Sequence, residues 1–169
     1  VSLLRMSRWK GLYAVSSVYI EVLRGTPILL QLYFFWLLLP KVLPIEMSDT
    51  SCIVVALIIN SSSYVAEVIR AGIQAVDKGQ MEAARSLGLS GRGAMRWVIL
   101  PQAVKNILPA LGNEFIQMVK ETSLASVFFV GELMTSYKTV QSATYLALPS
   151  LLIVGIIYFA VTFLLSRAM

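Results

Sequence analysis

Polar side chains recur at helical spacing inside two stretches of the sequence that are otherwise rich in apolar residues. The first set shares one face of a helix, at positions i, i+3, i+4 and i+7, and consists of Asn60, Ser63, Tyr64 and Glu67. The second set lies further along the chain and consists of Asn113, Glu114, Gln117, Glu121, Thr122 and Ser123. Carboxylates in this arrangement suit an ammonium group or a basic side chain. The chemistry that we expect from them is binding of a polar solute.

The composition indicates that these polar sets lie in a membrane. Of the 169 residues, 57% are hydrophobic and 14% are charged, and the mean hydropathy is +0.77. A soluble domain carries roughly 25% charged residues, so this chain has too few charges to cover its surface in water. The net charge of +5 is carried by short segments between apolar runs. That distribution is typical of the positive-inside bias and argues against nucleic acid as a partner.

Inside a bilayer, a charged side chain costs about 3 kcal/mol on insertion scales, so it generally faces a cavity or a partner. The two sets could therefore line a polar passage. Each set also has a structural explanation, which the sequence leaves open. Glu67 could pair with Arg70 one turn later, and Asn60 and the serines could hold helices together. The possible partners of Glu114 and Glu121 are Lys105 and Lys120.

Catalytic and metal chemistry are disfavoured by the residues that the chain lacks. There is no histidine, which removes His-based metal sites and Ser-His-Asp triads. The two aspartates, Asp49 and Asp77, both fall in predicted loops, so they do not form a facing catalytic pair. Cys52 is the single cysteine and cannot form an intrachain disulfide. We expect neither an enzyme nor a metal protein.

The elements that would position the polar sets are helices. We predict an all-α, polytopic transmembrane bundle that forms one domain over residues 1–169. An amphipathic helix over 1–24 would lie at the membrane surface, and the spans are expected at 26–45, 50–73, 97–134 and 144–166. From Arg70 to Arg96 there are five basic and two acidic residues, a net of +3, whereas Lys41, Glu46 and Asp49 give −1. The first of these segments is therefore predicted to be cytoplasmic and the second external, with both chain ends in the cytoplasm.

The cytoplasmic segment, about residues 74–101, predicts a rigid pair of short helices. The run Glu82-Ala83-Ala84-Arg85 is rich in helix formers, and Gly88 can end a helix in the left-handed conformation. We expect a second short helix that breaks at Pro101. Two short helices joined by a tight turn would form a knob that a soluble partner could grip.

This segment resembles the EAA loop of ABC importer permeases. It has Glu-Ala-Ala, three residues, Gly, nine residues and then Val98-Ile99-Leu100-Pro101, in which only Val98 departs from the usual Ile. The resemblance implies docking on a separate ATPase subunit through Glu82, Ala83, Ala84, Arg85, Gly88, Leu100 and Pro101. This chain has no phosphate-binding GxxxxGK[ST] motif, so ATP and magnesium would bind to the partner, and no cofactor is expected here.

Further stretches are similar to the permeases of polar amino acid importers. They are Arg24-Gly25-Thr26-Pro27, the run from Tyr64 to Ile73, Lys78-Gly79-Gln80, Asn113-Glu114-Phe115-Ile116 and the run from Lys120 to Val127. Members of that family usually have five spans, lie in the bacterial plasma membrane and pair with a second copy or a sister permease. An extracytoplasmic amino-acid-binding protein is also implied.

The sequence leaves three questions open. Only four spans are predicted and the chain begins with Val, so we expect that an N-terminal piece is missing. The two acidic residues of the second set favour a basic amino acid as the substrate. The alternatives are an importer of another small solute, such as a metal chelate, phosphonate or sulfonate, and a membrane assembly subunit that transports nothing.

Overall fold

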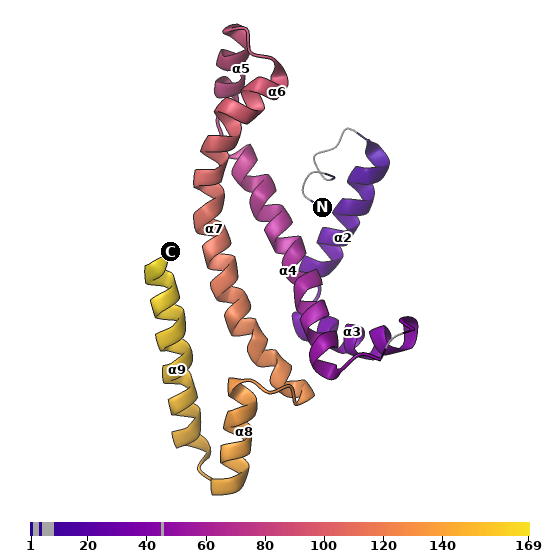
Figure 1. Cartoon of the computed structure of the whole chain (residues 1–169), viewed down its shortest axis with the longest axis vertical. Helices are drawn as coiled ribbons and strands as arrows, with labels where there is room; N and C mark the ends of the chain where they lie inside the picture. The colour runs from indigo at the N-terminus through magenta and orange to yellow at the C-terminus, as the bar shows by residue number, and fades with distance from the viewer. Residues whose placement is uncertain (2–3, 5–8, 45) are drawn as a thin grey trace. The chain divides into compact units, whose positions relative to one another are not determined.

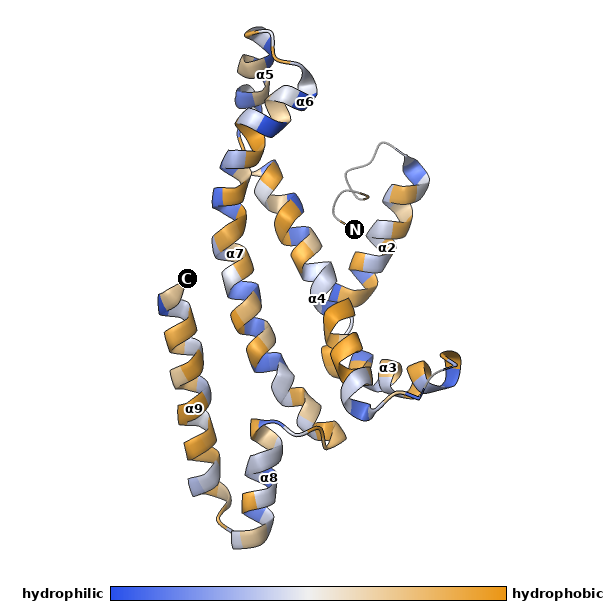
Figure 2. Cartoon of the chain, viewed as in Figure 1, coloured by the Kyte–Doolittle hydropathy of each residue, from blue (hydrophilic) through white to orange (hydrophobic). Residues whose placement is uncertain are grey.

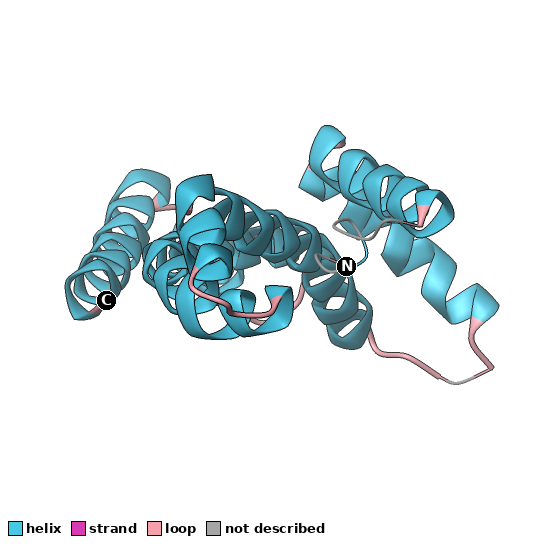
Figure 3. Ribbon diagram, turned by 90° about the horizontal axis from the view of Figure 1, so that it is seen from above, coloured by secondary structure: helices cyan, strands magenta, loops and turns pink. Residues whose placement is uncertain are grey.

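The computed structural model of the chain describes residues 1, 4, 9–44 and 46–169 (Figure 1). Figure 3 shows helix in every regular element that is drawn, so the all-α prediction is confirmed for these residues. The elements are α2 (Lys10–Gly25), α3 (Ile28–Val42), α4 (Asp49–Gln74), α5 (Lys78–Ser86), α6 (Gly91–Ala94), a π-helix (Met95–Ile99), α7 (Leu100–Glu121), a 3-10 helix (Thr122–Phe128), α8 (Leu133–Thr144) and α9 (Ala147–Ala168). Most of the residues that precede α2 in the predicted amphipathic helix lie outside the described part.

Two of the described helices, α4 and α9, are long and apolar enough to cross a bilayer. Figure 2 shows apolar residues over most of α9. Helices α2 and α3 would add a third span if the pair counts as one, although they are bent by 111° at the break between them. Pro27 explains the break, because it has no N–H and disfavours helical geometry in the residue before it. The predicted count of four spans stays a prediction.

The predicted span over 26–45 is shorter in the structure than expected. Helix α3 has 15 residues, which at 1.5 Å per residue is about 22 Å and short of the roughly 30 Å hydrocarbon core of a bilayer. It therefore reaches across a membrane only together with a neighbouring segment.

The predicted span over 97–134 is divided among several helices in the structure. Helix α7 ends at Glu121, and the chain continues as the 3-10 helix, turns at Phe129 with a φ of 56° and starts α8 at Leu133. The carboxylate of Glu132 accepts hydrogen bonds from the backbone N–H groups of Met134 and Thr135 at 2.8 and 2.6 Å. This is an N-cap, which begins a new helix.

The predicted break at Pro101 is wrong. The π-helix runs directly into α7, and Pro101 occupies the first turn of that helix. The Leu100 N–H donates to the Met95 carbonyl oxygen, five residues earlier. A proline removes one donor from a regular helix, and the wider π turn just before it accommodates that loss without ending the helix.

The chain forms two compact units, each built from two separate stretches of sequence. One contains residues 1–24 and 62–114, and the other contains 25–61 and 115–169. In the second unit, α3, the first part of α4 and the 3-10 helix share a core of Leu32, Ile53, Ala56, Ala125 and Phe128. The assignment of residues 1–169 to a single domain stays a prediction.

In the first unit, α4 and α7 approach closely at Gly72. A Cβ placed on Gly72 would overlap the Ile107 side chain, and both residues are buried. Small residues at such crossings let membrane helices pack backbone to backbone.

We expect Gly72→Ala to lower the free energy of unfolding by about 1–3 kcal/mol, because the added methyl group overpacks the contact with Ile107. Thermal unfolding of the purified chain in detergent measures the change. The matched control is Gly155→Ala in α9, where an added Cβ meets no atom within 4 Å. The control should keep or raise the unfolding temperature. Equal unfolding temperatures for Gly72→Ala and the wild type would contradict the close approach of α4 and α7.

Candidate functional site

The segment predicted to dock on a partner folds as two capped short helices. The Asp77 carboxylate accepts a hydrogen bond from the Gly79 N–H at 2.7 Å and starts α5. The Ser90 hydroxyl accepts one from the Gly93 N–H at 3.1 Å and starts α6. Both caps satisfy backbone donors that a helix start leaves unpaired. The two helices therefore begin at defined residues.

The turn between these helices is fixed at Gly88. Its φ is +89°, the left-handed conformation predicted from the sequence. The Gly88 N–H donates to the Arg85 carbonyl at 3.0 Å, and the Leu89 N–H donates to the Ala84 carbonyl at 3.2 Å. This pair of hydrogen bonds is the Schellman motif, in which glycine is favoured because side chains with a Cβ resist a positive φ.

The loop packs through small side chains and leaves large ones exposed. Ala84 is only 3% exposed, so it belongs to the internal packing of the loop and is not a surface contact. The other predicted docking residues are exposed, namely Glu82, Ala83, Arg85, Gly88, Leu100 and Pro101. Leu87 is 86% exposed and Trp97 is 68% exposed, and Arg96 lies 5.2 Å from the centre of the Trp97 ring. Leu87 and Trp97 were not predicted as contact residues, although large apolar residues in a hydrophilic segment are a visible signal of a contact surface.

Asn60, from the first polar set, is committed to packing. It is 4% exposed, and its amide donates to Gln31 Oε1 at 2.8 Å. The Gln31 amide in turn donates to Thr26 Oγ1 at 2.8 Å. This chain of hydrogen bonds links the start of α3 to α4 inside the second unit. Ser63 is fully buried as well, so the helix-packing explanation fits both residues better than a place on a passage.

Glu67 pairs with Arg70, as the structural explanation predicted, and also faces a second cation. Arg70 donates to both carboxylate oxygens of Glu67, with Nε at 3.0 Å from Oε2. From α2, a guanidinium nitrogen of Arg24 lies 4.0 Å from Glu67 Oε1, and its guanidinium carbon lies 5.3 Å from the centre of the Tyr64 ring. The contact of Arg24 with this cluster was not predicted, because helical periodicity reports neighbours on one helix only.

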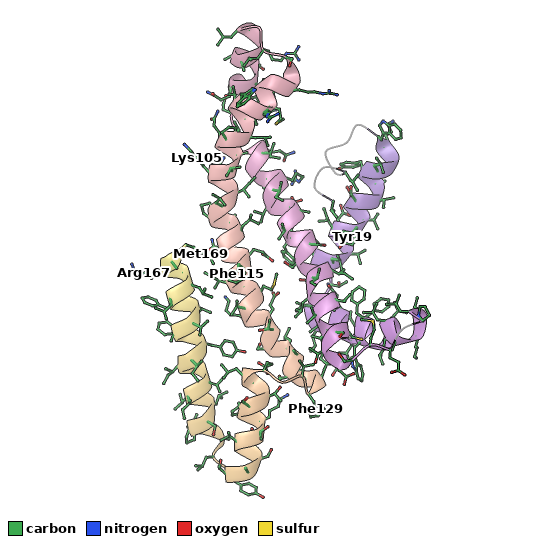
Figure 4. The ribbon with its side chains drawn as sticks, viewed as in Figure 1. Tyr19, Lys105, Phe115, Phe129, Arg167 and Met169 are labelled. Carbon is green, nitrogen blue, oxygen red and sulfur yellow. The ribbon has the colours of Figure 1, made fainter. Side chains whose placement is uncertain are left out.

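A second contact also joins α2 to α4 in this unit. The hydroxyl groups of Tyr19, which is labelled in Figure 4, and Ser62 share a hydrogen bond of 2.6 Å. The amphipathic face of α2 is therefore tied to the polar part of α4 by both a hydrogen bond and an ion pair.

The second polar set keeps part of its surface accessible. Asn113 and Gln117 are exposed, whereas Glu114, Glu121, Thr122 and Ser123 are half-buried. The Gln117 amide donates to Glu121 Oε1 at 3.1 Å, and the Thr122 hydroxyl donates to the Val119 carbonyl at 2.7 Å. In the unit to which they both belong, Glu121 pairs with Gln117 and makes no ion pair with Lys120. Ser123 and Lys120 help to line a cavity of about 360 Å³.

The family model described as "Binding-protein-dependent transport system inner membrane component" matches residues 2–169. The arginine transport system permease protein of Bacillus subtilis is 40% identical over 98% of this chain and 76% of its own length. A probable glutamine ABC transporter permease protein of the same organism is 39% identical over the same shares. A crystal structure of an amino acid ABC transporter with histidines matches with a TM-score of 0.92 and 49% identity, over 99% of this chain and 78% of that one.

We expect Asn60→Leu to lower the free energy of unfolding by about 1–3 kcal/mol, because it removes the buried donor to Gln31. Adding Gln31→Leu should recover part of the loss, so that a double-mutant cycle gives a coupling of roughly 0.5–3 kcal/mol. The control is Asn106→Leu, at an exposed position of α7, which should stay within about 0.5 kcal/mol of the wild type. Strictly additive effects of the two core substitutions would contradict the role of this hydrogen bond.

Proposed function

Because the chain belongs to the family of binding-protein-dependent transport system inner membrane components, we propose that it is the permease subunit of an ATP-driven importer for polar amino acids. The arginine and glutamine permeases among its relatives support this substrate class. Arginine carries a cationic side chain and glutamine a neutral one, and the polar residues along α4 and α7 suit both.

The observation that carries the proposal is the rigid attachment of the capped loop to two long helices. Residues 75–77 connect α4 to α5, and α6 continues through the π-helix into α7. The loop and the parts of α4 and α7 next to it belong to the same compact unit. A soluble subunit that moved this loop would therefore move both helices, since no long flexible segment intervenes.

We propose that this soluble subunit is a separate ATPase, which binds ATP and magnesium. The exposed residues of the loop would provide the contact, with Leu87 and Trp97 as its apolar anchors. Tryptophan and arginine are enriched among the residues that contribute most to protein interfaces, and Trp97 lies beside Arg96. The remaining partners are a second permease copy or a sister permease, an extracytoplasmic amino-acid-binding protein and the lipid of a bacterial plasma membrane.

The proposed substrate path uses the polar residues that packing does not bury. They are Tyr64, Glu67, Asn113, Glu114, Gln117, Glu121, Thr122 and Ser123. Asn60 and Ser63 support this path from inside the helix packing and do not line it.

Reconstitution tests the function directly. The permease, its ATPase and its binding protein would be assembled in proteoliposomes, and uptake of radiolabelled L-arginine and L-glutamine would be followed with and without ATP. ATP-dependent accumulation of either amino acid is the expected result. A complex that assembles and accumulates neither, while it accumulates a phosphonate or sulfonate, would contradict the substrate class. A chain that binds no ATPase would contradict the permease role.

We expect Gly88→Val to uncouple ATP hydrolysis from uptake, because a β-branched residue resists the left-handed turn that shapes the loop. The ratio of amino acid taken up to ATP hydrolysed, measured in proteoliposomes, should fall while membrane insertion stays normal. The matched variant is Gly88→Asn, since asparagine tolerates a positive φ better than other residues with a side chain. An unchanged ratio in Gly88→Val would argue against the docking role.

We expect Glu121→Gln to reduce uptake strongly while it changes the unfolding temperature little, because the residue is half-buried and its hydrogen bond to Gln117 can be kept by an amide. Initial uptake rates and thermal unfolding would be compared on the same preparation. Glu46→Gln, at an exposed position between α3 and α4, is the control for removing one negative charge. Wild-type uptake in Glu121→Gln would remove Glu121 from the path.

A further inference from the structure

Arg24 has unused hydrogen-bonding capacity beside a carboxylate. Its side chain is 42% exposed, and its ion pair with Glu67 is long, at 4.0 Å. Within the residues that the structure describes, the Arg24 guanidinium donates no hydrogen bond to any group, and it rests near the Tyr64 ring. A guanidinium carries five N–H donors in a planar fork that matches a carboxylate.

Arg70 differs from Arg24 in this respect. It donates to both oxygens of Glu67 and also to the side chain of Gln74 on its own helix. Arg70 is therefore held in place by α4, and it fixes the orientation of the Glu67 carboxylate. Arg24 comes from α2 and is the cation whose donors a ligand can still take.

We propose that Arg24 and Glu67 bind the charged backbone groups of the amino acid, the α-carboxylate on Arg24 and the α-ammonium on Glu67. This assignment rests on the proposed function. An α-amino acid carries both charges on one carbon, so it matches a cation and an anion that face each other from two helices. The long ion pair would be replaced by two direct, charge-assisted contacts, which are the stronger kind. Tyr64 would offer its ring face to the ammonium group.

The site would recognise the part that all α-amino acids share. It makes no contact that depends on the substrate's side chain. Arg24 would thus select for ligands that carry an α-carboxylate, and it would not distinguish one amino acid from another. Loss of the Arg24 guanidinium would therefore lower the affinity for a basic and for a neutral amino acid by the same factor.

The experiment compares each amino acid with the amine that lacks its α-carboxylate. The probes are L-arginine and agmatine, and L-glutamine and its decarboxylated amine. Equilibrium binding would be measured on the full importer complex in lipid nanodiscs, for the wild type and for Arg24→Gln. In the variant, affinity for the amino acids should fall roughly tenfold or more, the effect of one charge-assisted contact, and affinity for the amines should change little. Lys41→Gln, an exposed basic residue outside the site, should leave both affinities unchanged.

The ratio of the two affinities separates ligand binding from a structural role. If Arg24 only fastens α2 to α4, its substitution weakens both ligands equally and the ratio stays constant, which would overturn the proposal. A wild-type complex without preference for the carboxylate would overturn it too. If Arg24→Gln does not assemble, Arg24→Lys keeps the charge but loses the fork, and a reduced preference is again expected. If Arg24→Gln binds and transports the amino acids normally and the ratio of amino acid affinity to amine affinity is unchanged, only the role of Arg24 is contradicted. If the wild type binds neither amino acid, the proposed function is contradicted as well.

Discussion

The left-handed turn at Gly88 is the constraint on which the loop between α4 and α7 depends. It reverses the chain after α5, and the backbone N–H groups of Gly88 and Leu89 both donate hydrogen bonds to carbonyls of α5. The reversal packs α6 against α5 and buries Ala84 and Ala94. The chain then runs without a break through the π-helix into α7. A short, fully hydrogen-bonded turn transmits displacement, whereas a flexible loop would absorb it. The loop and the start of α7 thus form one continuous, hydrogen-bonded segment of the first unit.

The polar residues of the helices follow a second constraint, the cost of an unpaired polar group away from water. Asn60 meets it through Gln31, and Glu67 meets it through Arg70. In both cases one member of the pair also interacts with a third residue. The Gln31 amide donates a hydrogen bond to Thr26, and the Glu67 carboxylate also faces Arg24 from α2. The first of these chains fixes the packing next to the bend between α2 and α3. The second retains an accessible cation, Arg24, beside the Glu67 carboxylate.

Much of this arrangement followed from local sequence patterns. The helical class, the left-handed Gly88 and the pairing of Glu67 with Arg70 depend on residues within one or two turns of each other. The contacts of Asn60 with Gln31 and of Glu67 with Arg24 were missed, because each joins different helices and periodicity carries no information about partners. The end of α7 was missed for another reason. Helical periodicity does not mark Glu132 as the start of a new helix, although an acidic residue before a polar run is an N-cap signal. At Pro101 the general rule for proline was outweighed by the π turn before it.

That π turn also sets which way α7 faces. An α-helix turns by about 100° per residue, and a π-helix holds one residue more than the α-helical path requires. The extra residue in the π-helix Met95–Ile99 therefore sets the direction, around the axis of α7, in which each following side chain points. Loss of one residue inside this turn would leave the orientation of Asn113 and Glu121 intact, because the segment would tighten to an α-helix. The same loss a few residues later would rotate both away from their present direction. The turn is in this sense an angular adjustment between the two short helices and the long helix that follows them.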